Sequence, residues 1–227
     1  MGEKTAVVIG AAGGIGAALV RRLGFEGPVI ALSRRSDPAV DLLDEPGIVA
    51  AVAAIAQTGA ELRLVIDATG FLHGDGFSPE RSLRQIDPAH MARSFAINAI
   101  GPALLMKSFL PALPRQGRSV FATLSARVGS IGDNSLGGWY SYRAAKAALN
   151  QLVHTAAIEL RRSHPEAICI AIHPGTVATD LSAPFAKTGL ELQTADEAAG
   201  RILAVLNGLH PEQTGGFLDH HGKSIQW

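Results

Sequence analysis

Short runs of almost uninterrupted apolar residues recur along the chain, and segments with helical spacing separate them. The runs lie at 5–10, 28–33, 62–69, 119–125 and 167–174, and a shorter one, GGFLD, lies near the C-terminus. Strands that are apolar on both faces are typical of a parallel sheet covered by helices on both sides. The alternation therefore predicts an α/β fold, with a doubly wound parallel sheet of about seven strands flanked by helices.

The segments between these runs carry apolar residues at helical spacing. Ile15, Leu19 and Leu23 mark one face of the first helix. Further helices are expected at 49–56, 91–113, 144–160 and 195–206. No linker, repeat or low-complexity tract interrupts the pattern, so we expect one Rossmann-type domain over residues 1–227.

Composition excludes some classes of function. Lysine plus arginine and aspartate plus glutamate both number 20, so the net charge is zero. Nothing here predicts the basic surface of a nucleic-acid or anionic-membrane binder. The N-terminus shows no signal-peptide pattern, and the apolar run at 48–56 is too short to cross a bilayer. We therefore expect a cytoplasmic protein, in which the single cysteine, Cys169, is a buried and inert thiol.

A glycine-rich turn joins the first strand to the first helix. Gly10, Gly14 and Gly16 form it, with Ile15 between the last two. A glycine at the strand end permits a tight turn, and the exposed N–H groups of a helix N-terminus favour a pyrophosphate. A purely structural turn is the alternative. The position between first strand and first helix favours a nucleotide site.

The end of the second strand carries Ser33, Arg34 and Arg35. Proteins that bind the ribose 2′-hydroxyl of NAD place an acid about 20 residues after the glycines. Arginine instead suits a phosphate, because its guanidinium is a fixed, charged fork. Two solvated arginines at a strand end are the plainer interpretation. With the glycine turn upstream, the sequence predicts NADP(H) in preference to NAD(H).

These motifs, in their order and spacing, resemble those of the short-chain dehydrogenase/reductase family over nearly the whole chain. The stretches at 129–152 and 215–227 resemble most the C-factor branch of that family. The resemblance implies a Rossmann-fold oxidoreductase that transfers hydride between a nicotinamide and a carbonyl or alcohol group. The segments that carry it are GAAGGIG (10–16), VDLLDE (40–45), DATG (67–70), FAINAIG (95–101), YRAAK (142–146) and HPGTVAT (173–179).

The resemblance also implies roles for individual residues. Segment 40–45 corresponds to a short third strand whose Asp41 contacts the adenine, and segment 173–179 closes over the nicotinamide. Asn98 is implied to hold a water on the proton path. The expected cofactor-binding residues are Gly10, Gly14, Ile15, Gly16, Ser33, Arg34, Arg35, Asp41, Leu42, Ala68, Thr69, Gly70, Tyr142, Lys146, Pro174, Gly175, Val177 and Thr179.

Tyr142 and Lys146 lie four residues apart, so on a helix they share one face. A free phenol has a pKa near 10, and a nearby ammonium or cationic nicotinamide brings it toward the working pH. We expect Tyr142 to protonate the carbonyl oxygen during reduction. The resemblance implies that Lys146 also binds the nicotinamide ribose. The other tyrosine, Tyr140, fits a packed helix aromatic or a residue lining the substrate pocket or loop.

The chain departs from the family pattern beside this pair. The stretch LSARVGS places Ala126 where the family has its catalytic serine. Ser125 is the expected replacement, with Ser130 or no serine at all as alternatives. A missing donor to the developing oxyanion costs roughly 10²–10³ in turnover. The segment after Thr179 is short, so an open substrate pocket is expected.

Other sites are less well supported. His220 and His221, beside Asp219, lack metal-ligand spacing, and adjacent strand residues point to opposite faces, so no metal site is expected. The nucleophile elbow of hydrolases is absent.

The leading hypothesis is an NADP-dependent oxidoreductase acting on a small carbonyl or alcohol. The alternative is a nucleotide-binding signalling or regulatory protein with little turnover. The resemblance implies a homodimer or homotetramer, through the helices at 90–112 and 141–162.

Overall fold

The fold is built on one parallel sheet. The computed structural model describes residues 3–74, 76–179, 181 and 192–227. Neighbouring strands all pair in parallel, in the order β2-β1-β3-β4-β5-β6. This confirms the expected sheet, with six strands in the described residues in place of about seven. The strands are β1 (Lys4–Ile9), β2 (Val29–Leu32), β3 (Glu61–Asp67), β4 (Ser119–Leu124), β5 (Ala167–His173) and β6 (Phe217–Asp219).

Helices connect the strands as the apolar spacing predicts. They are α1 (Gly14–Leu23), α2 (Glu45–Gln57), α3 (Pro88–Phe95), α4 (Gly101–Phe109), α5 (Tyr140–Leu160) and α6 (Ala195–Asn207). The long segment expected at 91–113 is helical but irregular. A π-helical turn, η2 (Ala96–Ile100), joins α3 to α4, and a 3-10 turn, η3 (Leu110–Ala112), ends it.

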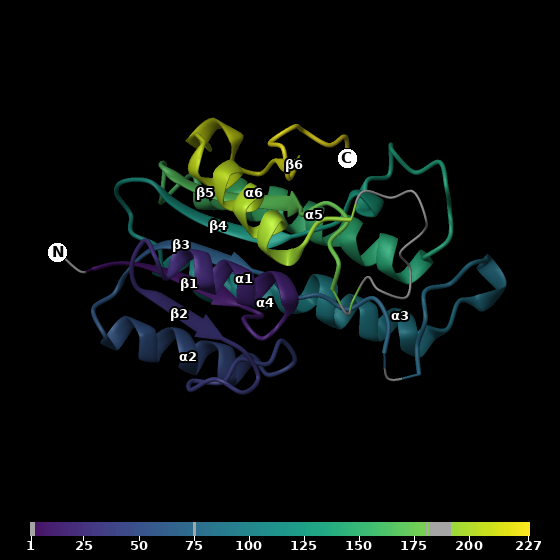
Figure 1. Cartoon of the computed structure of the whole chain (residues 1–227), viewed down its shortest axis with the longest axis horizontal. Helices are drawn as coiled ribbons and strands as arrows, with labels where there is room; N and C mark the ends of the chain where they lie inside the picture. Colours follow the sequence, from purple (N-terminus) through teal and green to yellow (C-terminus); the bar gives the residue numbers. More distant parts are fainter. Residues whose placement is uncertain (1–2, 75, 180, 182–191) are drawn as a thin grey trace.

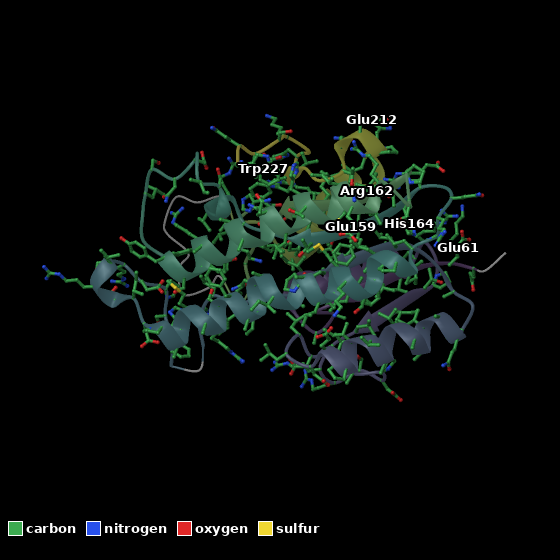
Figure 2. The ribbon with its side chains drawn as sticks, turned by 180° about the vertical axis from the view of Figure 1, so that it is seen from behind. Glu61, Glu159, Arg162, His164, Glu212 and Trp227 are labelled. Carbon is green, nitrogen blue, oxygen red and sulfur yellow. The ribbon has the colours of Figure 1, made fainter. Side chains whose placement is uncertain are left out.

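The helices cover both faces of the sheet (Figure 1). One apolar core includes Ile48 of α2, Leu105 of α4 and Leu149 of α5, all fully buried. The second core, on the opposite face, includes Leu19 of α1 and Ile202 of α6. Figure 2 shows the molecule from behind, with α2, α4 and α5 toward the viewer. Both faces of each central strand are therefore buried, which explains their continuous apolar runs.

The topology fixes where a ligand binds. The chain passes from β1 outward to β2 and then returns to β3 on the other side of β1. Ligands of doubly wound sheets bind beyond the carboxyl ends of the strands at such a switch point. The loops after the strands, together with α3, lie at this end, at the right of Figure 1.

The prediction of a short strand at 40–45, which the family resemblance implies, is wrong. Between β2 and α2 the described residues form two turns and a run of bends, and no strand. Val40 and Leu42 are nonetheless buried in the core below α4. A Cβ built on Gly101 would lie 2.6 Å from Cβ of Leu42, so the loop packs directly on that helix. The segment is therefore buried without strand pairing, unlike the strand that the resemblance implies.

The helical segment Pro88–Ala112 is apolar, but much of it is buried in the core. Pro88–Ala112 is long and apolar enough to cross a membrane by length and composition alone, but Leu105 and Phe109 within it are fully buried in the core. That is the behaviour of a core helix.

Helix α5 has a buried side and an exposed side. Ala157 is 1% exposed and belongs to the same core, whereas Ile158 is 54% exposed. Ala157 is therefore covered by the core of its own chain and is not part of the exposed surface of α5.

Candidate active site

The turn after β1 has a geometry that only glycine satisfies. Gly10 adopts a φ of +82°, and a Cβ there would lie 2.9 Å from the main-chain carbonyl carbon of Ala68. A Cβ on Gly16 would lie 2.1 Å from the carbonyl oxygen of Gly10. Helix α1 begins at Gly14, so its first N–H groups face the space above the turn. Such a helix start favours a bound phosphate.

A cavity of about 760 Å³ opens beside this turn, at the carboxyl ends of β1, β2 and β3. Its volume is in the range of sites for small molecules and cofactors. Half of the expected cofactor-binding residues line it: Gly10, Ser33, Arg34, Arg35, Asp41, Leu42, Ala68, Thr69 and Gly70. The others, Gly14, Ile15, Gly16, Tyr142, Lys146, Pro174, Gly175, Val177 and Thr179, do not border this cavity.

The cavity wall is rich in cationic side chains. Arg34 and Arg35 are exposed at its rim, and Arg93 lines it from α3. Its one acidic lining residue, Asp41, accepts a hydrogen bond from the main-chain N–H of Leu43 at 2.9 Å. Three guanidinium groups against one carboxylate suit a ligand with several phosphate charges.

The Tyr142–Lys146 pair lies on α5, as expected. Nζ of Lys146 donates a hydrogen bond to the main-chain oxygen of Leu124 at 2.8 Å and lies 5.9 Å from the Tyr142 ring centroid. Burial lowers the pKa of Lys146 to about 8, although the Asp67 carboxylate acts in the opposite direction. Burial also raises the pKa of Tyr142 above its usual value. Without a cofactor the phenol is therefore protonated at neutral pH, which is the state a proton donor needs.

Asp67 holds two strands together beneath the site, a role that the sequence analysis did not assign to it. It is 1% exposed and accepts hydrogen bonds from Thr69 N at 3.0 Å, Thr69 Oγ1 at 2.6 Å and Thr123 Oγ1 at 2.7 Å. These bonds tie β3 to β4 just below the site, while burial raises the pKa of the Asp67 carboxyl. An acid at the end of an apolar strand was the signal that could have found it.

Asn98 lies in the π-helical turn and is fully buried. Its Oδ1 accepts a hydrogen bond from Phe71 N at 2.9 Å, and its Nδ2 donates to Phe71 O at 2.7 Å. Both bonds hold the start of the loop that follows β3. Asn98 therefore ties that loop to η2, the turn between α3 and α4.

The serine positions differ in what their hydroxyl groups contact. Ser125 Oγ donates to Asn150 Oδ1 at 2.6 Å, and both side chains are buried. Ser130 Oγ accepts the N–H of Asp133 at 3.0 Å. Ala126 occupies the position between β4 and the 3-10 turn η4 (Arg127–Gly129). The proton of the Ser125 hydroxyl is thus directed into the protein, toward α5.

The segment after β5 approaches the glycine turn. Gly175 has a φ of +81°, and Val177 forms an isolated parallel bridge with Gln193. A Cβ on Gly14 would lie 2.8 Å from Cγ2 of Thr179, so this segment packs against the start of α1. Most of the stretch after Thr179, where the sequence predicts an open pocket, lies outside the described residues.

Within the described residues no group of three or more His, Cys, Asp or Glu side chains is arranged to hold a metal ion.

Residues 4–189 match the family model described as short chain dehydrogenase. The chain belongs to the short-chain dehydrogenase family. The family resemblance noted in the sequence is therefore confirmed, and the protein is an oxidoreductase.

Relatives of this short-chain dehydrogenase cover most of its length. It is 39% identical over 147 residues to the C-signal of Myxococcus xanthus, a match that covers 64% of this chain and 84% of that protein. It is 29% identical over 236 residues to 1-hydroxy-2-glutathionyl-2-methyl-3-butene dehydrogenase of Rhodococcus sp. (strain AD45), covering 99% of this chain and 100% of that protein. The first match confirms the resemblance to the C-factor branch.

Solved structures confirm the fold of this short-chain dehydrogenase. The NADPH-bound carbonyl reductase from chicken fatty liver superposes with a TM-score of 0.85 at 27% identity, covering 100% of this chain and 95% of that one. The carbonyl reductase Sniffer of D. melanogaster superposes with a TM-score of 0.83 at 22% identity, covering 100% of both chains.

The low pKa of Lys146 predicts how the stability of this dehydrogenase depends on pH. Burial lowers the pKa of Lys146 to about 8 in the folded protein, against 10.5 for an ordinary lysine. Between these values the unfolded chain holds more protons, so stability rises with pH. Relative to Lys146→Met, the wild type should gain on the order of 3 kcal/mol from pH 7 to pH 11.

Chemical denaturation of both proteins across this pH range measures the difference. Buried groups such as Cys169, whose pKa burial raises to about 12, contribute equally to both proteins and cancel. A difference that stays constant from pH 7 to pH 11 would show that Lys146 is not desolvated in the folded state.

Proposed function

We propose that this protein is an NADP(H)-dependent oxidoreductase of small carbonyl and alcohol compounds, with Tyr142 as the proton donor in the direction of reduction. The observation that carries the proposal is the Tyr142–Lys146 pair on α5, at the same end of the sheet as the cavity beside the glycine turn. The NADPH-bound carbonyl reductase, which superposes over the whole chain, supports it.

The residues of the turn fit a dinucleotide. A Cβ at Gly10 or Gly16 would clash with main-chain atoms, so the tight turn needs glycine at both positions. In such turns the N–H groups at the start of the helix face the pyrophosphate. Arg34, Arg35 and Asp41, which line the cavity from the loop after the edge strand β2, would lie along the adenosine half. When bound, NADPH supplies the hydride that is transferred to the carbonyl carbon.

The protein's own residues complete the reaction. As the carbonyl oxygen gains negative charge, the Tyr142 hydroxyl transfers its proton to it, which gives the alcohol and a phenolate. The Lys146 ammonium stabilises that phenolate electrostatically and thereby favours the transfer. Asn98 would hold the water that returns a proton to Tyr142. The reverse sequence oxidises an alcohol.

Arg34 and Arg35 set the expected preference for NADP(H). Changing both to alanine should weaken NADPH binding by about 100-fold, since two charge-assisted contacts are lost, and leave NADH binding nearly unchanged. The matched control is the pair Arg161 and Arg162, two adjacent exposed arginines just beyond the last residue of α5; Figure 2 labels Arg162. Fluorescence titration with both cofactors measures the effect. Equal losses for NADPH and NADH would refute the preference.

Ser125 gives a second test of the site. Because its proton is donated to Asn150, we expect the alternative in which no serine assists Tyr142. Ser125→Ala should lower kcat by less than about tenfold, and lower the free energy of unfolding by about 1–3 kcal/mol because Asn150 loses its partner. A loss of about 100-fold or more in kcat, with unchanged stability, would instead assign Ser125 as an oxyanion donor.

The proposal is tested by following NADPH consumption by absorbance with a panel of small aldehydes and ketones.

The second candidate function is that of a nucleotide-binding regulatory protein with little turnover. Ala126 in the serine position and the similarity to the C-signal favour it. NADPH binding without reduction of any carbonyl in the panel would support this candidate. Cytoplasmic location and a homodimer or homotetramer stay predictions.

A further inference from the structure

The chain takes an unusual path just before the proposed proton donor. Gly137, Gly138 and Trp139 have φ values of +63°, +67° and +53°, three left-handed residues in succession. This conformation is a genuine outlier for a residue as bulky as tryptophan. The indole of Trp139 lies edge-on to the ring of Tyr142, with centroids 6.2 Å apart. The path of this turn therefore affects the surroundings of Tyr142 directly.

Glu80 holds this turn from a distant part of the chain. It lies on the loop after β3, and it is only 2% exposed. Its main-chain oxygen accepts the N–H of Trp139 at 2.5 Å, and its carboxylate accepts the N–H of Ser141 at 3.2 Å. The Ser141 hydroxyl also donates to the carboxylate. Glu80 thus contacts the residues on both sides of Tyr140.

These contacts replace an ordinary helix cap. Helix α6 is capped by its own N-cap residue, Thr194, in a capping box with Glu197. The N-cap residue of α5 is Trp139, whose side chain makes no capping hydrogen bond. The orphan N–H of Ser141 is satisfied by Glu80, 61 residues earlier in the chain. Burying a carboxylate costs free energy of desolvation. Capping the helix alone therefore does not explain why a buried glutamate makes these contacts.

The surroundings of Glu80 make its position rigid. Nδ1 of His90 lies 3.4 Å from its carboxylate, and the His90 ring stacks on Phe77 with centroids 5.0 Å apart. The same loop begins at Phe71, which Asn98 holds by two hydrogen bonds. Described residues between β3 and α3 therefore contact both Asn98 and the start of α5.

We infer that Glu80 is a positioning residue, which fixes the left-handed Trp139 turn and through it the placement of Tyr142 for proton transfer. The inference rests on the proposed function only in the role of Tyr142. Ser141, between the two tyrosines, serves as the point of attachment and does not face the substrate.

Kinetics test the inference. Glu80→Ala should lower kcat by about 100-fold, the typical cost of misplacing a catalytic group by about 1 Å, with NADPH affinity unchanged. Glu80→Gln keeps an acceptor oxygen for Ser141 and should restore most of the activity. The matched controls are Glu166→Ala and Glu166→Gln, because Glu166 also accepts a backbone N–H, that of Gly117, at the opposite end of the sheet. Both controls should retain wild-type kcat.

Rates are expressed per NADPH-binding site, so that a fraction of unfolded protein does not lower kcat. A purely structural role for Glu80 would then leave kcat unchanged while lowering the melting temperature. Wild-type kcat per site in Glu80→Ala overturns the inference.

Fluorescence gives a readout that does not depend on turnover. The chain has two tryptophans, so in a Trp227→Phe background Trp139 is the only one. Glu80→Ala in that background should shift the emission to the red and lower its anisotropy, whereas Glu166→Ala should do neither. Unchanged emission and anisotropy overturn the inference. If these signals change while the wild-type protein reduces no carbonyl, the Trp139 turn is held by Glu80 and only the proposed function fails.

Discussion

Replacing Tyr142 by phenylalanine is expected to lower kcat for carbonyl reduction by about 10²–10⁴-fold, the usual contribution of a general acid. The substitution removes one oxygen from a half-buried ring and leaves the packing against Trp139 in place. NADPH affinity should change far less than kcat, because only one of the expected cofactor contacts is altered, and the main loss should appear in kcat. Steady-state kinetics with a saturating carbonyl substrate, together with a fluorescence titration of NADPH, measure the two quantities separately.

The chain offers a matched control on the same helix. Tyr140 is the only other tyrosine, and Tyr140→Phe removes the same group two residues away. It should cost far less activity, because residue 144, four positions on, is alanine and no ammonium lies there to stabilise a phenolate. Equal losses in both variants, or full activity in Tyr142→Phe, would contradict the assignment of the proton donor.

The second large effect is expected at the glycine turn. Gly16→Ala places a methyl group 2.1 Å from the carbonyl oxygen of Gly10, so the turn must open. Overpacking of this kind costs about 1–3 kcal/mol of stability. Because the start of α1 moves away from the phosphate position, NADPH affinity should fall by about 100-fold or more. Thermal unfolding and fluorescence titration measure the two effects.

Gly27 provides the control for this substitution. A Cβ at Gly27 would have nothing within 4 Å, and no positive φ restricts the position. Gly27→Ala should leave both NADPH affinity and the melting temperature at wild-type values. If Gly16→Ala binds NADPH as well as Gly27→Ala does, the turn does not hold the pyrophosphate.

The fold could be predicted from the sequence because its signals are local. Each of the six strands lies within or next to an apolar run, and the ends of most helices fall near those that periodicity predicts. The strand that the family resemblance implies at 40–45 does not form. Val40 and Leu42 are buried by packing under α4 without strand pairing, so the resemblance did not predict the backbone conformation of this segment.

The candidate site could be predicted only in part. Tyr142 and Lys146 are four residues apart, so their pairing is visible in the sequence. Glu80 reaches Ser141 across 61 residues, and no local pattern marks such a contact. The contact between Ser125 and Asn150 spans 25 residues and likewise depends on how β4 packs against α5. Residues that act through tertiary contacts become visible only in the structure.

Transfer of deuterium tests the central claim most directly. Wild-type protein is incubated with NADPH deuterated at the transferred position of the nicotinamide and with a panel of small carbonyl compounds, and the products are analysed by mass spectrometry. The account predicts an alcohol carrying one deuterium on the former carbonyl carbon, formed by the wild type and strongly reduced in Tyr142→Phe. NADPH that binds tightly but transfers no deuterium to any carbonyl would contradict it.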